Sequence, residues 1–344
     1  MNTQSCEPAV WLPTIRAGTG ADVFAMRLCD GLNAKGIRAE IGWLPHRAEY
    51  MPWAAQLLEP PVWANVVHVN SWLPTRFWPK GLPVVVTVHH LVHDPAYHPF
   101  RSPLQAVYHE LLIRPRERHA IRDAHAVTAV SEYVKRTVSE FSGREQITVI
   151  HNWIDGDAFA SRTDSNVNYS RPFRLFMAGS HSRRKGIDLL PAFLQALGPG
   201  FEVRYAGGKS RAAAPTANIV ELGKISESEL IREYQGCDAV VSLSRYEGFG
   251  YTALEAMACG KSFLGFNTSA LPEVVAGCGL LVSTGDVHAL ARVARELRER
   301  ASTDKPEGAI GRERALRYFS AANLDKYVVL YSSLIEKNHA IRSA

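Results

Sequence analysis

The chain has 344 residues, of which 46% are hydrophobic and 21% are charged, a composition typical of a soluble globular protein. This length favours two domains, each large enough to bury its own core. No run of about 18 apolar residues occurs, and the first residues are neither basic nor apolar, so we expect no membrane span, no signal peptide and a cytoplasmic location. The net charge of +5 is too small to favour nucleic-acid binding, and the five scattered cysteines lack metal-ligand spacing.

The first predicted elements are a strand, a glycine turn and a helix. Residues 8–14 form a short apolar segment, and apolar residues at helical spacing continue to Gly36. The turn contains Gly18 and Gly20, but Val23 stands where a dinucleotide fingerprint needs its third glycine. This order predicts the start of a Rossmann-like unit, in which a tight strand-to-helix turn can account for both glycines.

Three histidines follow a predicted buried strand. Residues 66–70 and 84–88 are β-branched apolar runs, and the second ends in His89, His90 and His93. Ligands of parallel sheets bind beyond the carboxyl ends of the strands, so His89 is a candidate ligand contact. A metal site is one alternative, although neighbouring strand residues point to opposite faces. A core or surface histidine without a ligand is the other.

Residues 100–121 combine apolar side chains at helical spacing with several arginines. This pattern predicts an amphipathic helix with a solvated basic face. The alternative is a helix that lies on an anionic membrane surface.

Two more strands, a linker and a terminal helix complete the outline. Residues 126–130 and 147–150 predict the strands, and the polar residues 157–171 predict an interdomain linker. We therefore expect a first domain over residues 1–165 and a second over 166–320. A C-terminal helical segment over 321–344 can cross back to the first domain.

The second domain opens with a cationic turn. Residues 173–177 predict a strand and 187–197 a helix, and Arg183, Arg184 and Lys185 lie between them. The positive excess of the chain lies in residues 166–344, which suits an anionic ligand. Three adjacent cations at this turn fit a diphosphate, and solvated loop charges are the alternative.

A glycine loop between two carboxylates is the most informative stretch. A strand is predicted from Ala239 to Ser244, Gly248 and Gly250 follow it, and a helix begins near Thr252 with its N–H groups facing the loop. Glu247 precedes the loop, and Glu255 is expected in the first turn of the helix. Alternatively, Thr252 and Glu255 form a capping box.

These two carboxylates, the following Ala-Met-Ala-Cys-Gly and a closing Pro-Glu resemble the signature of glycosyltransferase family 4. That family comprises retaining sugar transferases of the group 1 type. The resemblance is strong over residues 173–285 and looser over 8–155. It implies an α/β protein of the GT-B fold, with two Rossmann-like domains that face each other across a cleft.

The resemblance also implies roles for individual residues. Lys185 matches a lysine that clamps the donor phosphates, Glu247 meets the donor sugar, and Glu255 binds the ribose hydroxyls. His89 contacts the sugar near the reacting carbon, and backbone groups at Lys224 and Ile225 hold the nucleobase. The implied catalytic residues are Lys185, Glu247 and His89, and the implied substrate-binding residues are Gly18, Gly20, Ser180, Arg183, Arg184, Lys224, Ile225, Gly248, Phe249, Gly250, Tyr251, Thr252 and Glu255.

Three positions depart from the family pattern. Ser180 stands where the second phosphate-binding cation is an arginine, so Arg183 or Arg184 would have to replace it. His90 stands where an acidic residue is usual, and Trp153 replaces a glycine.

The expected function is transfer of a hexosyl unit, with retention, from a nucleoside diphosphate sugar to a hydroxyl of a glycan or lipid-linked acceptor, as in cell-surface polysaccharide or lipopolysaccharide synthesis. We expect no metal, no cofactor besides the donor and no nucleic-acid partner. We expect a cytoplasmic enzyme, and peripheral contact with the inner face of the membrane is one alternative for its location. An inactive nucleotide-sugar-binding partner subunit is an alternative. An NAD-dependent oxidoreductase is another, and it rests only on Gly18 and Gly20.

Overall fold

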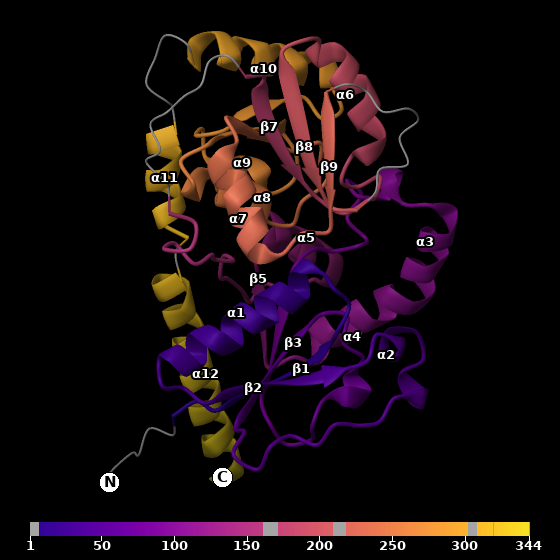
Figure 1. Cartoon of the computed structure of the whole chain (residues 1–344). Helices are drawn as coiled ribbons and strands as arrows, with labels where there is room; N and C mark the ends of the chain where they lie inside the picture. Colours follow the sequence, from indigo (N-terminus) through magenta and orange to yellow (C-terminus); the bar gives the residue numbers. More distant parts are fainter. Residues whose placement is uncertain (1–6, 161–170, 209–217, 302–307, 319, 344) are drawn as a thin grey trace. The chain divides into compact units, whose positions relative to one another are not determined.

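The computed structural model describes residues 7–160, 171–208, 218–301, 308–318 and 320–343 (Figure 1). Most of the predicted linker, residues 161–170, lies outside these ranges. The chain forms two compact units. The first unit comprises residues 1–94, 102–153 and 320–344, and the second comprises 95–101 and 154–319.

The first unit is built on a six-stranded parallel sheet in the order β2-β1-β3-β4-β5-β6. The strands predicted over 66–70 and 84–88 are confirmed with the same bounds. The strand at the sheet edge was not predicted, because Glu40 and Gly42 interrupt its apolar run. The strands are β1 Val10–Ile15, β2 Ala39–Leu44, β3 Val66–Asn70, β4 Val84–Val88, β5 Ala126–Ala129 and β6 Ile147–Val149.

The helix predicted over residues 100–121 is three consecutive segments: α3 Pro103–Tyr108, the π-helical turn η4 His109–Ile113, and α4 Arg114–Asp123. Pro115 explains the change of period. It has no N–H to donate to the carbonyl of Leu111, so the α-helical bonding pattern cannot continue there. The other helices of the sheet connections are α1 Gly20–Ala34, α2 Arg47–Tyr50 and α5 Glu132–Ser142.

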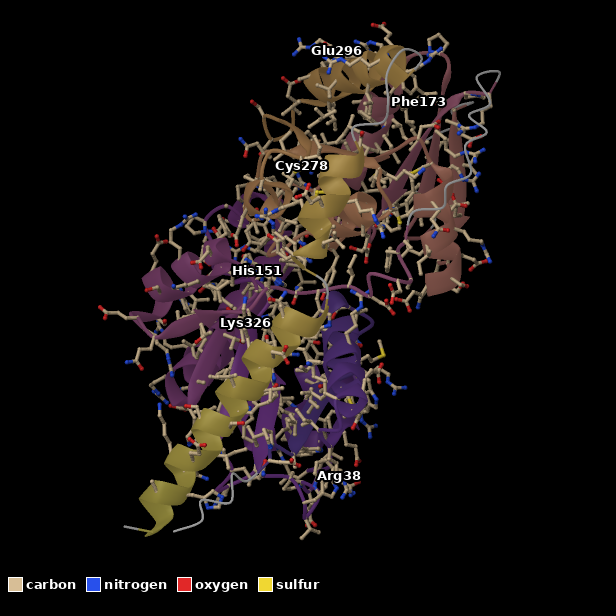
Figure 2. The ribbon with its side chains drawn as sticks, turned by 90° about the vertical axis from the view of Figure 1, so that its left-hand side faces the viewer. Arg38, His151, Phe173, Cys278, Glu296 and Lys326 are labelled. Carbon is tan, nitrogen blue, oxygen red and sulfur yellow. The ribbon has the colours of Figure 1, made fainter. Side chains whose placement is uncertain are left out.

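The last helix, α12 Ser320–Ser343, completes the core of the first unit. It lies along α1 and contacts β3, and Figure 2 shows it beside the first unit, with Lys326 labelled. Tyr327 and Tyr331 are fully buried, with Leu324, Leu334 and Ile335 around them. Burying this apolar face stabilises a terminal segment that would be marginal as an isolated helix.

The second unit contains another six-stranded parallel sheet, in the order β12-β11-β10-β7-β8-β9. The strand expected from Ala239 to Ser244 is shorter than predicted, because pairing ends at Val241. The strands are β7 Phe173–Ala178, β8 Phe201–Ala206, β9 Ile219–Gly223, β10 Ala239–Val241, β11 Ser262–Phe266 and β12 Leu280–Val282. The helices are α6 Leu190–Leu197, α7 Glu227–Gly236, α8 Tyr251–Ala258, α9 Leu271–Val275, α10 Val287–Ala301 and α11 Gly308–Leu316.

Each sheet has one position where the strand order reverses. In the first unit it lies between β1 and β3, and in the second between β7 and β10. Loops that leave such neighbouring strands diverge to opposite faces of the sheet, and the crevice between them is where open parallel sheets bind ligands. The two reversals therefore indicate where to look for a site in each unit.

Candidate active site

The reversal point of the second unit holds an ion pair between the two predicted motifs. Lys185, in the turn after β7, donates from Nζ to Glu247 Oε1 at 2.5 Å. Arg184 Nη1 lies 3.7 Å from the other carboxylate oxygen of Glu247 and donates to the carbonyl of Tyr246 at 3.2 Å. Arg183, by contrast, is exposed. The turn after β7 and the loop after β10 thus meet through Lys185, Arg184 and Glu247.

Gly186 lets the cationic turn approach the loop after β10. Its φ is +71°, and a Cβ at this position would lie 1.9 Å from the carbonyl oxygen of Leu243, so no other residue fits without a backbone shift. Arg245 holds the turn from the other side, with bonds of 2.7 and 2.8 Å to the carboxylate of Asp188 and one of 2.8 Å to the carbonyl of Arg183. Sequence reasoning missed Arg245, since a bidentate pair across 57 positions leaves no local pattern.

Burial and charge act against each other at this ion pair. Burial lowers the pKa of Lys185, and the neighbouring Glu247 carboxylate opposes that effect. Burial alone would raise the pKa of Glu247, but the charges of Lys185 and Arg184 outweigh it and hold the pKa below its usual value. The carboxylate of Glu247 is therefore ionised at neutral pH.

The glycine loop ends in the N-terminus of α8. The helix begins at Tyr251 with Gly250 as its N-cap, and Gly250 has a φ of +105°. The first N–H groups of α8 thus adjoin the loop and suit an anionic group. The side chain of Phe249 is buried in edge contact with Tyr251 and Tyr318, so the loop presents its backbone, including buried Gly248.

Glu255 has a different environment from the one predicted. No side-chain cap is present at the start of α8, so the capping-box alternative is wrong, and Glu255 is the fifth residue of the helix rather than part of its first turn. Its Oε2 accepts a hydrogen bond of 2.8 Å from the hydroxyl of Tyr234 on α7. The Tyr234 hydroxyl also bonds to the side chain of Thr252. Burial, followed by the charge of Glu255, raises the pKa of Tyr234 well above its usual value, so the phenol remains a donor. Sequence reasoning did not identify Tyr234.

Three further predicted residues of the second unit, Ser180, Lys224 and Ile225, make no contact described above with Lys185, Arg184 or Glu247. Ser180 is exposed at the start of the cationic turn, with its hydroxyl 3.5 Å from that of Ser182. Exposed Lys224 and half-buried Ile225 follow β9, the edge strand that is separated from β7 by β8.

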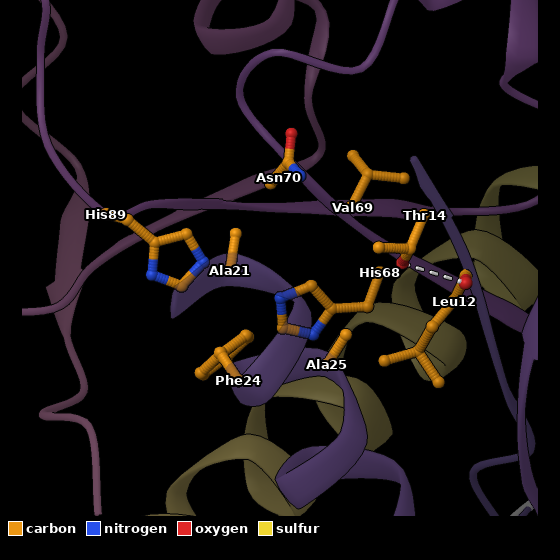
Figure 3. Close-up of a pocket in the computed structure, with 9 residues that line it drawn as sticks. All are labelled: Leu12, Thr14, Ala21, Phe24, Ala25, His68, Val69, Asn70 and His89. Atoms are coloured by element: carbon orange, nitrogen blue, oxygen red, sulfur yellow. Dashed lines mark hydrogen bonds between the residues drawn. The ribbon is translucent and has the colours of Figure 1, made fainter. Parts of the chain in front are cut away.

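The reversal point of the first unit contains a small pocket of about 10 Å³, lined by His68 and His89 (Figure 3). The ring of His89 meets Phe24 edge to face at 4.7 Å. His68 bonds to the hydroxyls of Tyr331 at 2.5 Å and Thr87 at 2.7 Å. Burial lowers the pKa of His89 to about 4 and that of His68 to about 3. Both rings are therefore neutral at physiological pH, and His89 is suited to hydrogen bonding rather than to carrying charge.

The N-terminal glycine turn has an internal acceptor. The N–H groups of Ala17 and Gly18 donate to Oδ2 of Asp22 at 3.0 and 2.8 Å, and Gly20 is the first residue of α1. Because these N–H groups already donate to Asp22, the geometry favours a tight strand-to-helix turn at Gly18 and Gly20 over direct binding of a phosphate.

Within the described ranges, no group of three or more His, Cys, Asp or Glu side chains is arranged to hold a metal ion, which includes the triplet at 89, 90 and 93. Likewise, no described helix is both long enough and apolar enough to span a bilayer.

Comparison with known families agrees with this arrangement. A model of "Glycosyl transferases group 1" matches residues 161–313, and one of "Glycosyltransferase Family 4" matches residues 37–158, so that together they cover most of the chain. The chain belongs to this group of glycosyltransferases.

Curated relatives of the chain are also glycosyltransferases. The chain is 28% identical over 280 residues to MMP alpha-(1->4)-mannosyltransferase of Mycolicibacterium hassiacum, a match that covers 74% of this chain and 67% of the relative. Other curated relatives are matched over a smaller share of their length, 56% for a Methanocaldococcus jannaschii glycosyltransferase.

Sucrose-phosphate synthase of Thermosynechococcus elongatus superimposes with a TM-score of 0.77 at 20% identity, over 96% of this chain and all of that structure. Anabaena HepE in complex with UDP-glucose gives 0.67 at 17% identity, over 96% and 99%. The predicted α/β fold of the GT-B class is confirmed.

Proposed function

We propose that this glycosyltransferase moves a hexosyl unit from a nucleoside diphosphate sugar to a hydroxyl of a glycan or lipid-linked acceptor, with retention at the anomeric carbon. The observation that carries the proposal is the ion-paired cluster of Lys185, Arg184 and Glu247 beside the N-terminus of α8. It combines fixed positive charge for a diphosphate with a carboxylate that can hold sugar hydroxyls.

In this proposal Lys185 and Arg184 bind the diphosphate, and Arg184 takes the part of the arginine missing at Ser180. Arg184 is preferred to Arg183 because its guanidinium already faces Glu247. The N–H groups of Gly250, Tyr251 and Thr252 add the positive end of the α8 dipole. Glu255, oriented by Tyr234, receives the ribose hydroxyls.

The chemical step breaks the bond between the anomeric carbon and the phosphate oxygen and forms one to the acceptor oxygen. The acceptor proton passes to the departing phosphate, as the family resemblance implies, so no side-chain base is required. Fixed cations that face the developing negative charge are the contribution that usually dominates such catalysis, and Lys185 and Arg184 supply them. His89, neutral at physiological pH, would orient the sugar by hydrogen bonding.

The relatives support a hexosyl donor. One curated relative is a mannosyltransferase, and one structural neighbour was solved with UDP-glucose. A lipid-linked acceptor, as in cell-surface polysaccharide synthesis, would bring the enzyme to the cytoplasmic face of a membrane as a peripheral protein.

The test is a thermal shift titration with UDP, GDP and ADP, followed by a screen of the matching nucleotide hexoses for transfer and slow donor hydrolysis. A ligand at a hundred times its Kd stabilises the fold by about 2.7 kcal/mol. A shift with one nucleotide, together with release of its sugar, is the expected result. If none of the three shifts the Tm, the proposal fails.

Two other functions make different predictions. An inactive partner subunit would give the nucleotide shift without donor hydrolysis, and its motivation is the departures at Ser180, His90 and Trp153. An NAD-dependent oxidoreductase would give a shift with NAD. Asp22 argues against that function, because it occupies the N–H groups of the glycine turn.

A further inference from the structure

Exposed apolar side chains are concentrated in two segments of the first unit. Among the side chains that the structure describes, twelve large apolar ones are exposed, and eight of these belong to residues 50–62 and 104–111. Val62 is fully exposed, Leu104 is 80% exposed and Trp53 is 71% exposed. We call these eight residues the apolar flank: Tyr50, Met51, Trp53, Leu57, Val62, Leu104, Val107 and Leu111.

The two segments of the apolar flank are joined. The rings of Tyr50 and Tyr108 lie 5.5 Å apart, and the Tyr108 hydroxyl donates to Glu49 Oε1 at 2.5 Å. Arg116 donates to the carbonyl of Glu49 at 2.6 Å. Figure 1 shows α2, α3 and α4 on the same side of the first unit. The contacts with Glu49 and Tyr50 therefore fix residues of the α2 region against the α3–α4 segment.

The helical segment 103–123 exposes Leu104, Val107 and Leu111 for a simple geometric reason. Ile113, Glu117 and Ile121 recur at helical spacing and are fully buried, so they lie on the side that packs against the rest of the first unit. Leu104, Val107 and Leu111 are spaced by three and four residues on the opposite side and are mostly exposed. Apolar side chains gathered on one exposed face indicate a partner rather than a folding role.

Exposed arginines lie toward the end of α4. Arg118, Arg122 and Arg144 line a hollow of about 540 Å³ together with Phe141. The Arg118 guanidinium lies over the Phe141 ring at 5.5 Å, Arg144 donates to the carbonyl of Ile121 at 2.6 Å, and Arg122 pairs with Asp123. We call this the arginine hollow. Its lining contains three arginines and no acidic side chain, so the lining carries a positive charge.

We propose that the apolar flank and the arginine hollow dock the first unit on a bilayer that contains anionic phospholipids. Trp53 and the aliphatic side chains would enter the region between headgroups and acyl chains, and the arginines would meet lipid phosphates. Side chains as exposed as Val62 and Leu104 can enter a fluid partner that surrounds them. This inference rests on the membrane contact proposed above, but its test does not require catalysis.

The test is flotation of the full-length protein with vesicles of phosphatidylcholine alone and with about a third phosphatidylglycerol. Binding to the anionic vesicles is expected. Leu104→Ser with Leu111→Ser should weaken it about tenfold, and Arg118→Gln with Arg122→Gln about fivefold for each charge lost. Matched controls are Val329→Ser and Ile310→Ser, equally exposed apolar residues elsewhere, and Arg292→Gln, an exposed arginine of α10.

Each outcome bears on the proposal. Loss of binding in the flank and hollow variants, with unchanged control variants and unchanged thermal melts, supports it. Absence of binding to anionic vesicles, equal binding to neutral ones, or equal losses in the controls overturns it. So does self-association that depends on the flank, which would make a second copy the occupant. Nucleotide thermal shifts of the same variants should equal those of the unaltered protein, so a failure of the proposed transfer chemistry is recognised separately.

Discussion

Lys185 and Glu247 stand 62 positions apart in the sequence, and their side chains meet at 2.5 Å where the strand order of the second sheet reverses. The pair links the cationic turn to the glycine loop. Lys185 comes from the turn after β7 and Glu247 from the loop that precedes α8. A ligand that binds at either segment therefore experiences the charges of both.

Replacement of Lys185 by Ala should abolish the nucleotide-induced thermal shift and lower kcat by about 100-fold or more, because it removes a fixed cation from the developing phosphate charge. The measurement is donor turnover together with the shift. Lys35→Ala is a matched control, since Lys35 also pairs with a distant carboxylate, Asp325 at 2.6 Å, but on the surface. That variant should change stability by less than about 1 kcal/mol and leave turnover unaltered. A Lys185→Ala protein with a normal thermal shift would contradict its role.

Gly186→Ala should destabilise the protein and displace Lys185, because the new Cβ would meet the Leu243 carbonyl oxygen at 1.9 Å. Gly143 offers a close comparison. It has the same φ of +71°, but a Cβ there meets nothing within 4 Å. Gly143→Ala should cost only the conformational penalty, about 1–2 kcal/mol, whereas Gly186→Ala should cost more and also weaken nucleotide binding. Equal losses in the two variants, measured by chemical denaturation, would show that the close approach has no effect.

Tyr234→Phe should weaken nucleotide binding about 3- to 10-fold, because Glu255 loses the hydrogen bond that orients it. Such a hydrogen bond is worth about 1 kcal/mol. The phenyl ring still packs against Phe176. Calorimetric titration with a ribonucleotide and its 2′,3′-dideoxy analogue gives the comparison, and the loss should be confined to the ribonucleotide. Tyr108→Phe removes a similar hydroxyl from a carboxylate, that of Glu49 in the first unit, and should leave nucleotide affinity unaltered. Equal losses for the two ligands would mean that Tyr234 supports the fold only.

Glu117 should make the stability of the protein depend on pH. Burial raises its pKa from the usual 4.5 to about 8, with the hydrogen bond from Trp72 opposing the shift. Between these two values the folded protein retains a proton that the unfolded chain has released. The stabilising contribution is therefore fully present below 4.5 and is lost as the pH rises through about 8.

Glu117→Gln removes this titration and keeps an oxygen for the Trp72 N–H. The Tm of the unaltered protein should fall more steeply from pH 5 to pH 8 than the Tm of the variant. Both proteins retain His93, which lies near Glu117, and Glu110, which lies near His93, so these groups do not cause the difference. Parallel Tm profiles would refute the pKa assignment.

Local patterns in the sequence account for the parts of the fold that depend on few neighbours. The runs at 66–70 and 84–88 are β-branched and uninterrupted, so their strands were predicted with the bounds that the structure has. The sequence does not predict the edge strand β2, because Glu40 and Gly42 interrupt its apolar pattern. It predicts one continuous helix over 100–121, because a single proline, Pro115, has little effect on the helical periodicity. Such errors occur where one or two residues outweigh the average of the surrounding window.

What the sequence determined by itself is the class of fold, the cationic turn at 183–185 and the carboxylates on either side of the glycine loop, since each is written in consecutive residues. Tertiary structure alone decided that Arg184 rather than Arg183 faces Glu247, that Tyr234 holds Glu255, that Asp22 takes the N–H groups beside Gly18, and that Tyr327 and Tyr331 bury α12 in the first unit. Each of these contacts depends on the direction in which a side chain leaves its helix, strand or loop. The hydrophobic period and the motif spacing of the sequence do not contain that information.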